Sequence, residues 1–213
     1  MLTLRAFPFN PLAANTVVVA SGGEAAIVDA TALYDNEIDA LVRHLEDEHL
    51  TVRHLLLTHA HVDHVFSCDA LAERFGLGWA LHRGDEPLLP FAPVSAQLFQ
   101  VPFPAGKPPE IERWLVEGER IALGDTTLEV RPVPGHSPGS VAFYVEDAGA
   151  IVVGDALFRG SIGRTDLPGG DLPTLLRSIE TQILTLPDDT VVYPGHGPAT
   201  TVGVERRTNP YLT

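Results

Sequence analysis

The apolar and polar positions of the chain follow two periods, one typical of strands and the other typical of helices. Short β-branched or apolar runs that end at turn residues predict strands. The turn Ser21-Gly22-Gly23-Glu24 lies between two such runs and predicts a hairpin. The predicted strands are 2–8, 16–20, 25–29, 52–57, 79–82, 120–123, 126–130, 140–145, 150–154 and 190–193.

Apolar residues recur at helical spacing in segments that follow these strands. One helix is predicted over Asp35–Leu50, and a second is predicted to begin near His64 and to end at Gly76. A third begins after Asp171, whose side chain suits an N-cap, and a short one is predicted near 204–208. The strands thus form two batches, each followed by helices, which favours two sheets packed face to face with helices outside. No linker-like stretch divides the chain, so we predict one domain over residues 1–213.

Residues 84–109 contain seven prolines and cannot form one regular element. Long loops of this kind often have a function. Phe91, Phe99 and Phe103 in this segment can form an apolar lid over a site, or they can fill the edge of the core in a simple connector. The sequence does not separate these two interpretations.

The segment Thr58-His59-Ala60-His61-Val62-Asp63-His64 directly follows the predicted buried strand 52–57. Side chains two positions apart in an extended segment point to the same side, so His59 and His61 can bind one ion. The start of the next helix changes the direction of Asp63 and His64, which can then serve a second ion. A single ion would leave two of these four side chains without a role, so the pattern predicts a site for two metal ions.

Three further candidate ligands follow predicted strands and lie beside glycines. They are His136 in Pro-Gly-His-Ser-Pro-Gly, Asp155 in Val-Gly-Asp and His196 in Pro-Gly-His-Gly. Each motif alone is a weak signal, but together they supply the ligands that a two-metal site still needs. A carboxylate can bind two ions at once, so Asp155 is the natural bridge between them.

The order THxHxDH, GHSPGS, VGDALF and YPGHGP resembles the metallo-β-lactamase superfamily across nearly the whole chain. The segments GDALFRGSIGRTDLPGGD and PGHGPATTVGVERRTNPYL resemble those of the short bacterial glyoxalase II-type hydrolases. The resemblance implies an α/β fold, the αββα sandwich of two mixed sheets with helices on the outer faces. It also implies two divalent metal ions. Zinc is the expected metal, and iron or a zinc/iron pair is the alternative. His59, His61 and His136 would hold the first ion, Asp63, His64 and His196 would hold the second, and Asp155 would bridge them.

The same resemblance implies a hydroxyacylglutathione hydrolase-like thioesterase, in which a hydroxide between the two ions attacks the thioester carbonyl of an S-acylglutathione. Asp63 would orient this hydroxide and accept its proton. Arg164 stands where these hydrolases begin a substrate-binding segment with lysine, and it can meet a substrate carboxylate or simply pair with a neighbouring acid. Asp29 would support a metal ligand from behind, or it is an ordinary strand-end residue.

Other chemistries remain open at this point. Persulfide dioxygenases share the fold and a GRTD segment like 163–166, and they use one iron held at positions matching His61, His136 and Asp155. A lactonase or a β-lactamase of the same fold is a further alternative, because one fold supports many reactions.

The composition of the chain limits the classes of molecule that the protein is expected to bind. The net charge of −14 disfavours binding to nucleic acid, since an anionic surface repels phosphates. The sequence has one cysteine, no apolar run long enough to span a membrane and no signal-peptide pattern. We therefore expect a cytoplasmic enzyme with a small-molecule thioester substrate and no membrane or nucleic-acid partner, whose oligomeric state is open.

Overall fold

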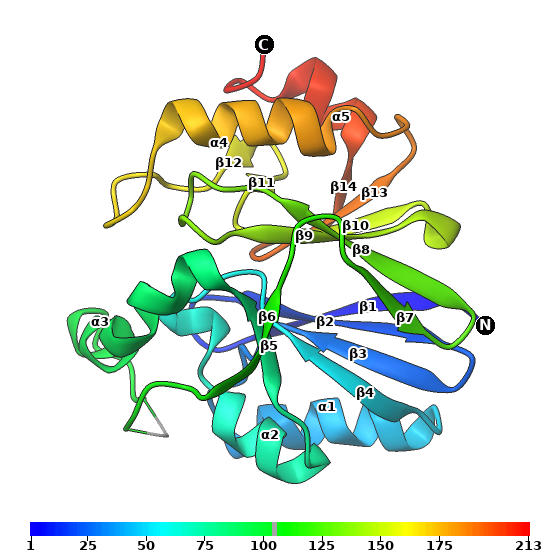
Figure 1. The fold of residues 1–213 in the computed structure, drawn as a ribbon, viewed down its shortest axis with the longest axis vertical. Helices are drawn as coiled ribbons and strands as arrows, with labels where there is room; N and C mark the ends of the chain where they lie inside the picture. The colour runs from blue at the N-terminus through cyan, green and yellow to red at the C-terminus, as the bar shows by residue number, and fades with distance from the viewer. Residues whose placement is uncertain (104–105) are drawn as a thin grey trace.

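The computed structural model describes residues 1–103 and 106–213, so Pro104 of the proline-rich segment lies outside the described residues. Two six-stranded sheets face each other (Figure 1). The first sheet contains, in spatial order, β1 (Thr3–Phe9), β2 (Ala14–Ser21), β3 (Glu24–Val28), β4 (Thr51–Leu56), β5 (Trp79–His82) and β6 (Ile111–Leu115). The second contains β14 (Thr200–Thr201), β13 (Val191–Pro194), β10 (Ala150–Gly154), β9 (Val141–Val145), β8 (Thr126–Pro132) and β7 (Arg120–Leu123). A small ribbon of β11 (Leu157–Phe158) and β12 (Ser161–Ile162) lies beside them.

Helices cover the outer faces of both sheets. Helices α1 (Asp35–Asp47) and α2 (Cys68–Phe75) pack on the first sheet, and α4 (Leu172–Ser178) and α5 (Val202–Thr208) lie over the second (Figure 1). Both sheets are mixed, because β3 to β6 run parallel beside the antiparallel β1 and β2, and β13 runs parallel to β10 in an otherwise antiparallel sheet. The predicted αββα sandwich is therefore confirmed.

Side chains on both faces of the central strands are buried, which explains why these strands lack polar alternation. On β2, Val17 and Val19 point between the sheets, where they join Phe143 of the second sheet. Val18, between them, points the other way into the core beneath α1 and α2. A third apolar cluster around Leu175 fills the space between the second sheet and α4. Three layers of core thus hold the strand ends, and the loops that leave them, in fixed positions.

The helix predicted from His64 begins four residues later than expected. Residues Val62–His64 form a single 3-10 turn, and α2 starts at Cys68. The backbone carbonyl of His64 accepts a hydrogen bond of 2.9 Å from the N–H of Ala30, so it does not start a helical ladder. The predicted end is confirmed, since Gly76 closes α2 in the left-handed conformation with φ 64°.

The proline-rich segment is not one regular element, as predicted. It begins as a 3-10 segment over Arg83–Phe91 and continues as α3 (Ala92–Leu98), in which Pro93 occupies the first turn, where its missing N–H costs little. The strand β6 that follows was not predicted. Among the described residues, no helix is long and apolar enough to cross a membrane.

Candidate metal centre

Four loops that leave the carboxyl ends of strands bring the seven predicted ligand residues together. The loop after β4 carries four of them, and the loops after β8, β10 and β13 each carry one. One group with ligand atoms within 4.8 Å of one another contains His59, His61 and His136, and another contains Asp63, His64 and His196. These are the two sets that the resemblance implies for the two ions.

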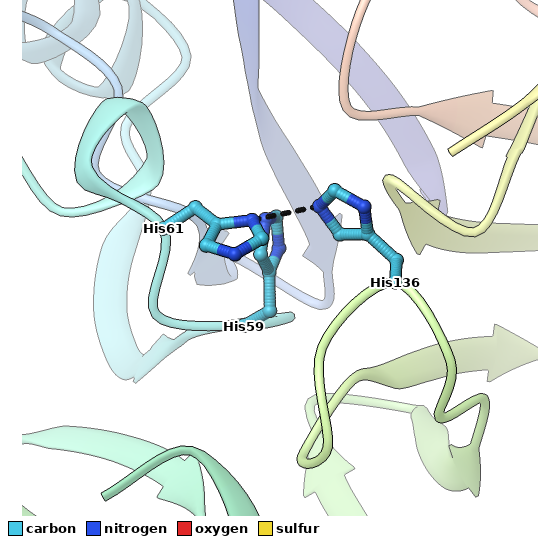
Figure 2. A group of neighbouring side chains, drawn as sticks. All are labelled: His59, His61 and His136. Carbon is cyan, nitrogen blue, oxygen red and sulfur yellow. Dashed lines mark hydrogen bonds between the residues drawn. The ribbon is translucent and has the colours of Figure 1, made fainter. Parts of the chain in front are cut away.

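In the first group, imidazole nitrogens point at one another. His61 Nδ1 lies 2.8 Å from His136 Nε2 (Figure 2). His59 Nε2 is buried and has no hydrogen-bond partner. Burial and the neighbouring His136 lower the pKa of His61 to about 4, and burial with His64 and His61 nearby lowers the pKa of His59 well below its ordinary value. Both imidazoles are therefore neutral near pH 7, which is the form that binds a metal.

The second group pairs imidazoles with carboxylates. Asp63 Oδ2 lies 3.0 Å from His196 Nε2. Burial alone would lower the pKa of His64, but the carboxylates of Asp155, Asp63 and Asp29 raise it well above its ordinary value. The effect is mutual. Burial would raise the pKa of Asp63 and of Asp155, but the neighbouring His64 holds both pKa values below the ordinary value. Two ionised carboxylates, Asp63 within the group and Asp155 beside it, therefore lie next to these imidazoles.

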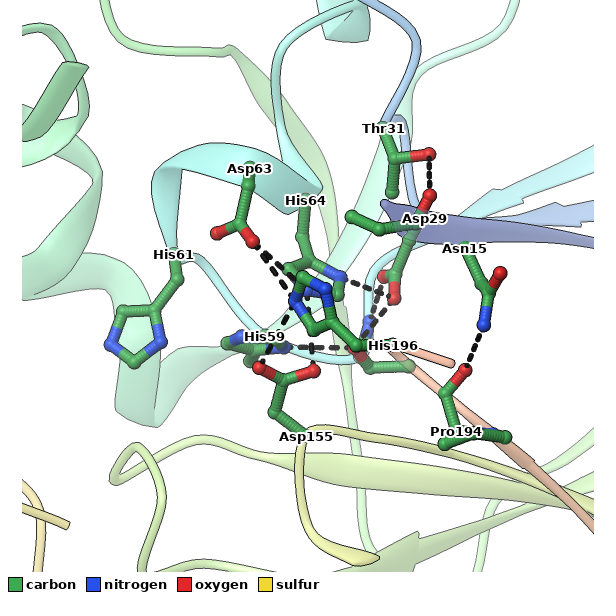
Figure 3. A network of polar contacts seen from close by, with 12 residues as sticks. Asn15, Asp29, Thr31, His59, His61, Asp63, His64, Asp155, Pro194 and His196 are labelled. Carbon is green, nitrogen blue, oxygen red and sulfur yellow. Dashed lines mark hydrogen bonds and ion pairs between the residues drawn. The ribbon is translucent and has the colours of Figure 1, made fainter. Parts of the chain in front are cut away.

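The carboxylate of Asp155 points towards His64 and His196 of the second group (Figure 3), and it also approaches His136 of the first group. Its Oδ1 atom is 3.3 Å from His64 Nε2, although neither atom makes a well-aligned hydrogen bond. Its Oδ2 atom is 3.5 Å from His136 Nε2 and also 3.5 Å from His196 Nε2. One carboxylate thus approaches members of both groups, which is the position that a bridging ligand requires.

Four of the five histidines in the cluster make a hydrogen bond through Nδ1 to an atom outside the cluster, so that their Nε2 atoms face inward. The Nδ1 partners are Thr58 Oγ1 for His59 at 2.9 Å, Asp29 Oδ2 for His64 at 2.9 Å, Arg164 O for His136 at 2.8 Å and Leu12 O for His196 at 3.0 Å. Such partners orient metal-binding imidazoles and make them more basic. His61 differs, because its Nδ1 atom faces the cluster.

Asp29 supports both groups at once. Its Oδ2 atom accepts from His64 Nδ1 and from the hydroxyl of Thr58 at 2.8 Å, and that hydroxyl contacts His59 Nδ1. The Thr58 N–H donates to Asp29 Oδ1 at 2.7 Å. Asp29 also has a left-handed backbone with φ 66°, a conformation that non-glycine residues rarely adopt. The structure therefore places Asp29 behind the cluster. The sequence left open whether Asp29 supports a candidate metal ligand or is an ordinary strand-end residue, and this position is that of a supporting residue.

The donor set fits two divalent cations. Buried polar atoms in folded proteins nearly always have a partner, yet His59 Nε2, His64 Nε2 and Asp155 Oδ1 lack one and all face the cluster. Imidazole nitrogens and carboxylate oxygens are the ligands that zinc and iron accept. Bound metal ions would supply the partners that these buried atoms lack.

Glycines next to the ligands make room for the cluster. A Cβ atom on Gly195 would lie 2.0 Å from Asp155 Oδ1 and 2.8 Å from His64 Cε1. A Cβ atom on Gly163 would lie 1.8 Å from the Asp155 carbonyl oxygen and 3.1 Å from His136 Nδ1. Gly195 and Gly163 are thus needed for the close approach of the loops around Asp155.

Sequence reasoning missed Asp85, which lies in the proline-rich segment and is completely buried. Its carboxylate accepts hydrogen bonds from Ala60 N–H at 2.9 Å, Ser137 Oγ at 2.7 Å and Gly139 N–H at 2.6 Å. Burial raises the pKa of Asp85 above its ordinary value, although these donors oppose the shift. No motif surrounds Asp85, so the sequence carried no signal for this role.

Arg164 lies at a cavity of about 510 Å³ above the cluster. Its guanidinium group forms two hydrogen bonds of 2.7 Å with the carboxylate of Asp166. The structure thus shows the pairing with a neighbouring acid and also places Arg164 where a ligand in the cavity can reach it.

Comparison with known proteins places this geometry in a family. The model of the Metallo-beta-lactamase superfamily matches residues 9–196. The "Hydroxyacylglutathione hydrolase GloC" of Haemophilus influenzae is 40% identical over 88% of this chain and 87% of its own length. The structure titled "BLEG-1 B3 metallo-beta-lactamase" is similar with a TM-score of 0.89 and 38% identity, covering 99% of this chain and 100% of that chain. The structure of TTHA1623 "in a di-iron-bound form" has a TM-score of 0.88 and 40% identity, covering 98% and 100%.

Proposed function

The chain belongs to the metallo-β-lactamase superfamily and is a metallo-hydrolase of that family, and from this premise we propose that it is a binuclear thioester hydrolase acting on S-acylglutathione-type substrates. The single observation that carries the binuclear assignment is the position of Asp155 between two complete donor groups. The likeness to GloC supports the thioester chemistry, since that relative carries the name of a hydroxyacylglutathione hydrolase.

His59, His61 and His136 would hold one ion, Asp63, His64 and His196 the other, and Asp155 both. When bound, such ions lower the pKa of a water molecule to about 7 and polarise a substrate carbonyl. We propose zinc as the metal; the di-iron form of TTHA1623 supports iron as the alternative.

The protein side chains would orient the reactants. Asp63 is partly exposed to the cavity, and its carboxylate can accept a proton from the attacking water. Arg164 at the edge of the cavity can bind a substrate carboxylate if it exchanges its partner Asp166.

Hydrolysis of S-lactoylglutathione by zinc-loaded protein, together with metal analysis, tests the proposal. The Asp155→Ala variant should lose turnover and retain less metal than wild type. Asp39→Ala, an exposed acid on α1, is the control and should behave like wild type. A zinc- or iron-loaded wild type that cleaves no thioester, or an Asp155→Ala variant with full activity, would contradict the proposal. Oxygen uptake with glutathione persulfide by the iron-loaded protein would instead favour the dioxygenase alternative.

A further inference from the structure

The cavity above the cluster has a polar floor and an apolar wall. The floor is formed by cluster residues, among them His61, His136 and His196. The wall is formed by the 3-10 segment, by α3 and by the residue that follows α3. It includes Leu88, Phe91, Val94, Leu98 and Phe99. A volume of about 510 Å³ is in the range of small-molecule sites.

Exposed apolar side chains gather at this cavity. Among the described residues, eleven large hydrophobic side chains are exposed, and five of them line it: Leu12, Phe91, Val94, Leu98 and Phe99. Phe91 is 60% exposed and Leu98 is 77% exposed. Single exposed apolar residues are ordinary, but a group of them at the edge of a cavity marks a binding surface.

The charges around the cavity disfavour a ligand that is polar along its whole length. Apart from the histidines, Arg164 is the one cationic residue among the described residues that line the cavity, and it is already paired with Asp166. The chain as a whole carries a net charge of −14. The part of a ligand that lies beyond the cluster and Arg164 would therefore find few charged partners in this cavity.

We propose that the wall formed by the 3-10 segment and α3 binds an apolar group attached to the scissile thioester, so that the preferred substrates are thioesters with a long alkyl or aryl group. This inference rests on the proposed function and adds the substrate class. The polar floor faces the thioester, and the apolar group lies along Phe91, Val94 and Leu98. Its removal from water supplies the binding energy.

Zinc-loaded protein is assayed on the N-acetylcysteamine thioesters of acetate, butanoate, hexanoate, octanoate and decanoate. The ratio kcat/KM should rise along this series, by up to about fourfold for each methylene that becomes fully buried. S-Decyl thioacetate carries the alkyl chain on the thiol side of the thioester. Its kcat/KM, compared with that of the decanoyl thioester, shows which side of the thioester the wall accepts. A rise on either side supports the proposal.

A variant pair tests the wall itself. Val94→Glu places a charge on α3, and Val116→Glu makes the same change at an exposed valine outside the cavity, with the native side chains 53% and 63% exposed. Val94→Glu should lower the decanoyl-to-acetyl ratio of kcat/KM at least about tenfold, because the charge must be desolvated against the chain. Val116→Glu should keep the wild-type ratio.

Binding without turnover separates this inference from the proposed function. The probe is S-decyl-N-acetylcysteamine, a thioether that cannot be hydrolysed, compared with its S-ethyl analogue by calorimetry. If no thioester is cleaved but the decyl probe binds wild type and not Val94→Glu, the proposed function fails and the apolar site stands. If thioesters are cleaved with no dependence on chain length and the decyl probe binds no better than the ethyl probe, the inference is overturned and the proposed function stands. It is equally overturned if Val94→Glu dissolves a dimer and leaves the chain-length dependence unchanged, because the wall would then be an interface between copies.

Discussion

The carboxylate of Asp85 accepts a hydrogen bond of 2.7 Å from the hydroxyl group of Ser137, although the two residues lie 52 positions apart. Ser137 follows His136, and the same carboxylate accepts from the N–H of Ala60, between His59 and His61. Asp85 therefore ties together the two loops that supply the first histidine group. It also anchors the start of the proline-rich segment, whose later part forms the apolar wall of the cavity.

Asp85→Asn should destabilise the fold. The amide keeps one acceptor oxygen but replaces the other with a donor, so at least one of the three N–H or O–H groups loses its partner in a buried site. Such a loss costs about 1–3 kcal/mol. The free energy of unfolding in urea measures it, with Asp39→Asn on the exposed face of α1 as the control. Equal unfolding free energies for the two variants would show that Asp85 does not hold these loops.

Gly195→Ala should weaken metal binding with little change in secondary structure. The added methyl group would lie 2.0 Å from Asp155 Oδ1, so the proposed bridging carboxylate must move. The affinity for zinc should fall at least about tenfold, as it does when the support of a ligand is lost. Metal content after dialysis and circular dichroism measure the two effects.

Gly197→Ala is the control for that experiment. Gly197 has φ 75°, so alanine strains the same loop, but a Cβ atom there meets no atom within 4 Å. This variant should lose about 1 kcal/mol of stability and keep its metal. If both variants retain metal equally, the contact between Gly195 and Asp155 does not matter for binding.

The layers of the fold and the members of the metal cluster could be predicted because each leaves a local signal. Strands buried on both faces appear as apolar runs, as in β2, and the candidate ligands lie in short motifs beside glycines. Helix α2 began later than predicted because the backbone carbonyl of His64 pairs with Ala30, a contact between distant segments that periodicity does not contain. Asp85 could not be found for the same reason, since its three donors come from two other loops. Contacts between loops depend on the assembled fold, and no local pattern predicts them.

Asp29→Asn and Thr58→Val should affect the two metal positions differently. Asp29 Oδ2 accepts from both His64 Nδ1 and the Thr58 hydroxyl, so an amide nitrogen in its place leaves both groups without support. Thr58→Val removes only the hydroxyl that contacts His59 Nδ1. Asparagine tolerates the left-handed backbone at this position, so the first variant should still fold.

Zinc titration against a chromophoric chelator, fitted with two sites, distinguishes the variants. Asp29→Asn should lower the affinity of both sites by about 10- to 100-fold, and Thr58→Val should lower that of one site by a similar factor. Thr51→Val, at the exposed start of β4, is the matched control and should titrate like wild type. Identical curves for Asp29→Asn and Thr58→Val would mean that Asp29 acts only through Thr58 and that its contact with His64 contributes nothing to the second site. A fall in only one of the two zinc affinities for Asp29→Asn would also contradict a shared support. The Thr58 hydroxyl, which contacts His59, and His64 Nδ1 both donate to the same Oδ2 atom, so a change at that atom should affect both sites.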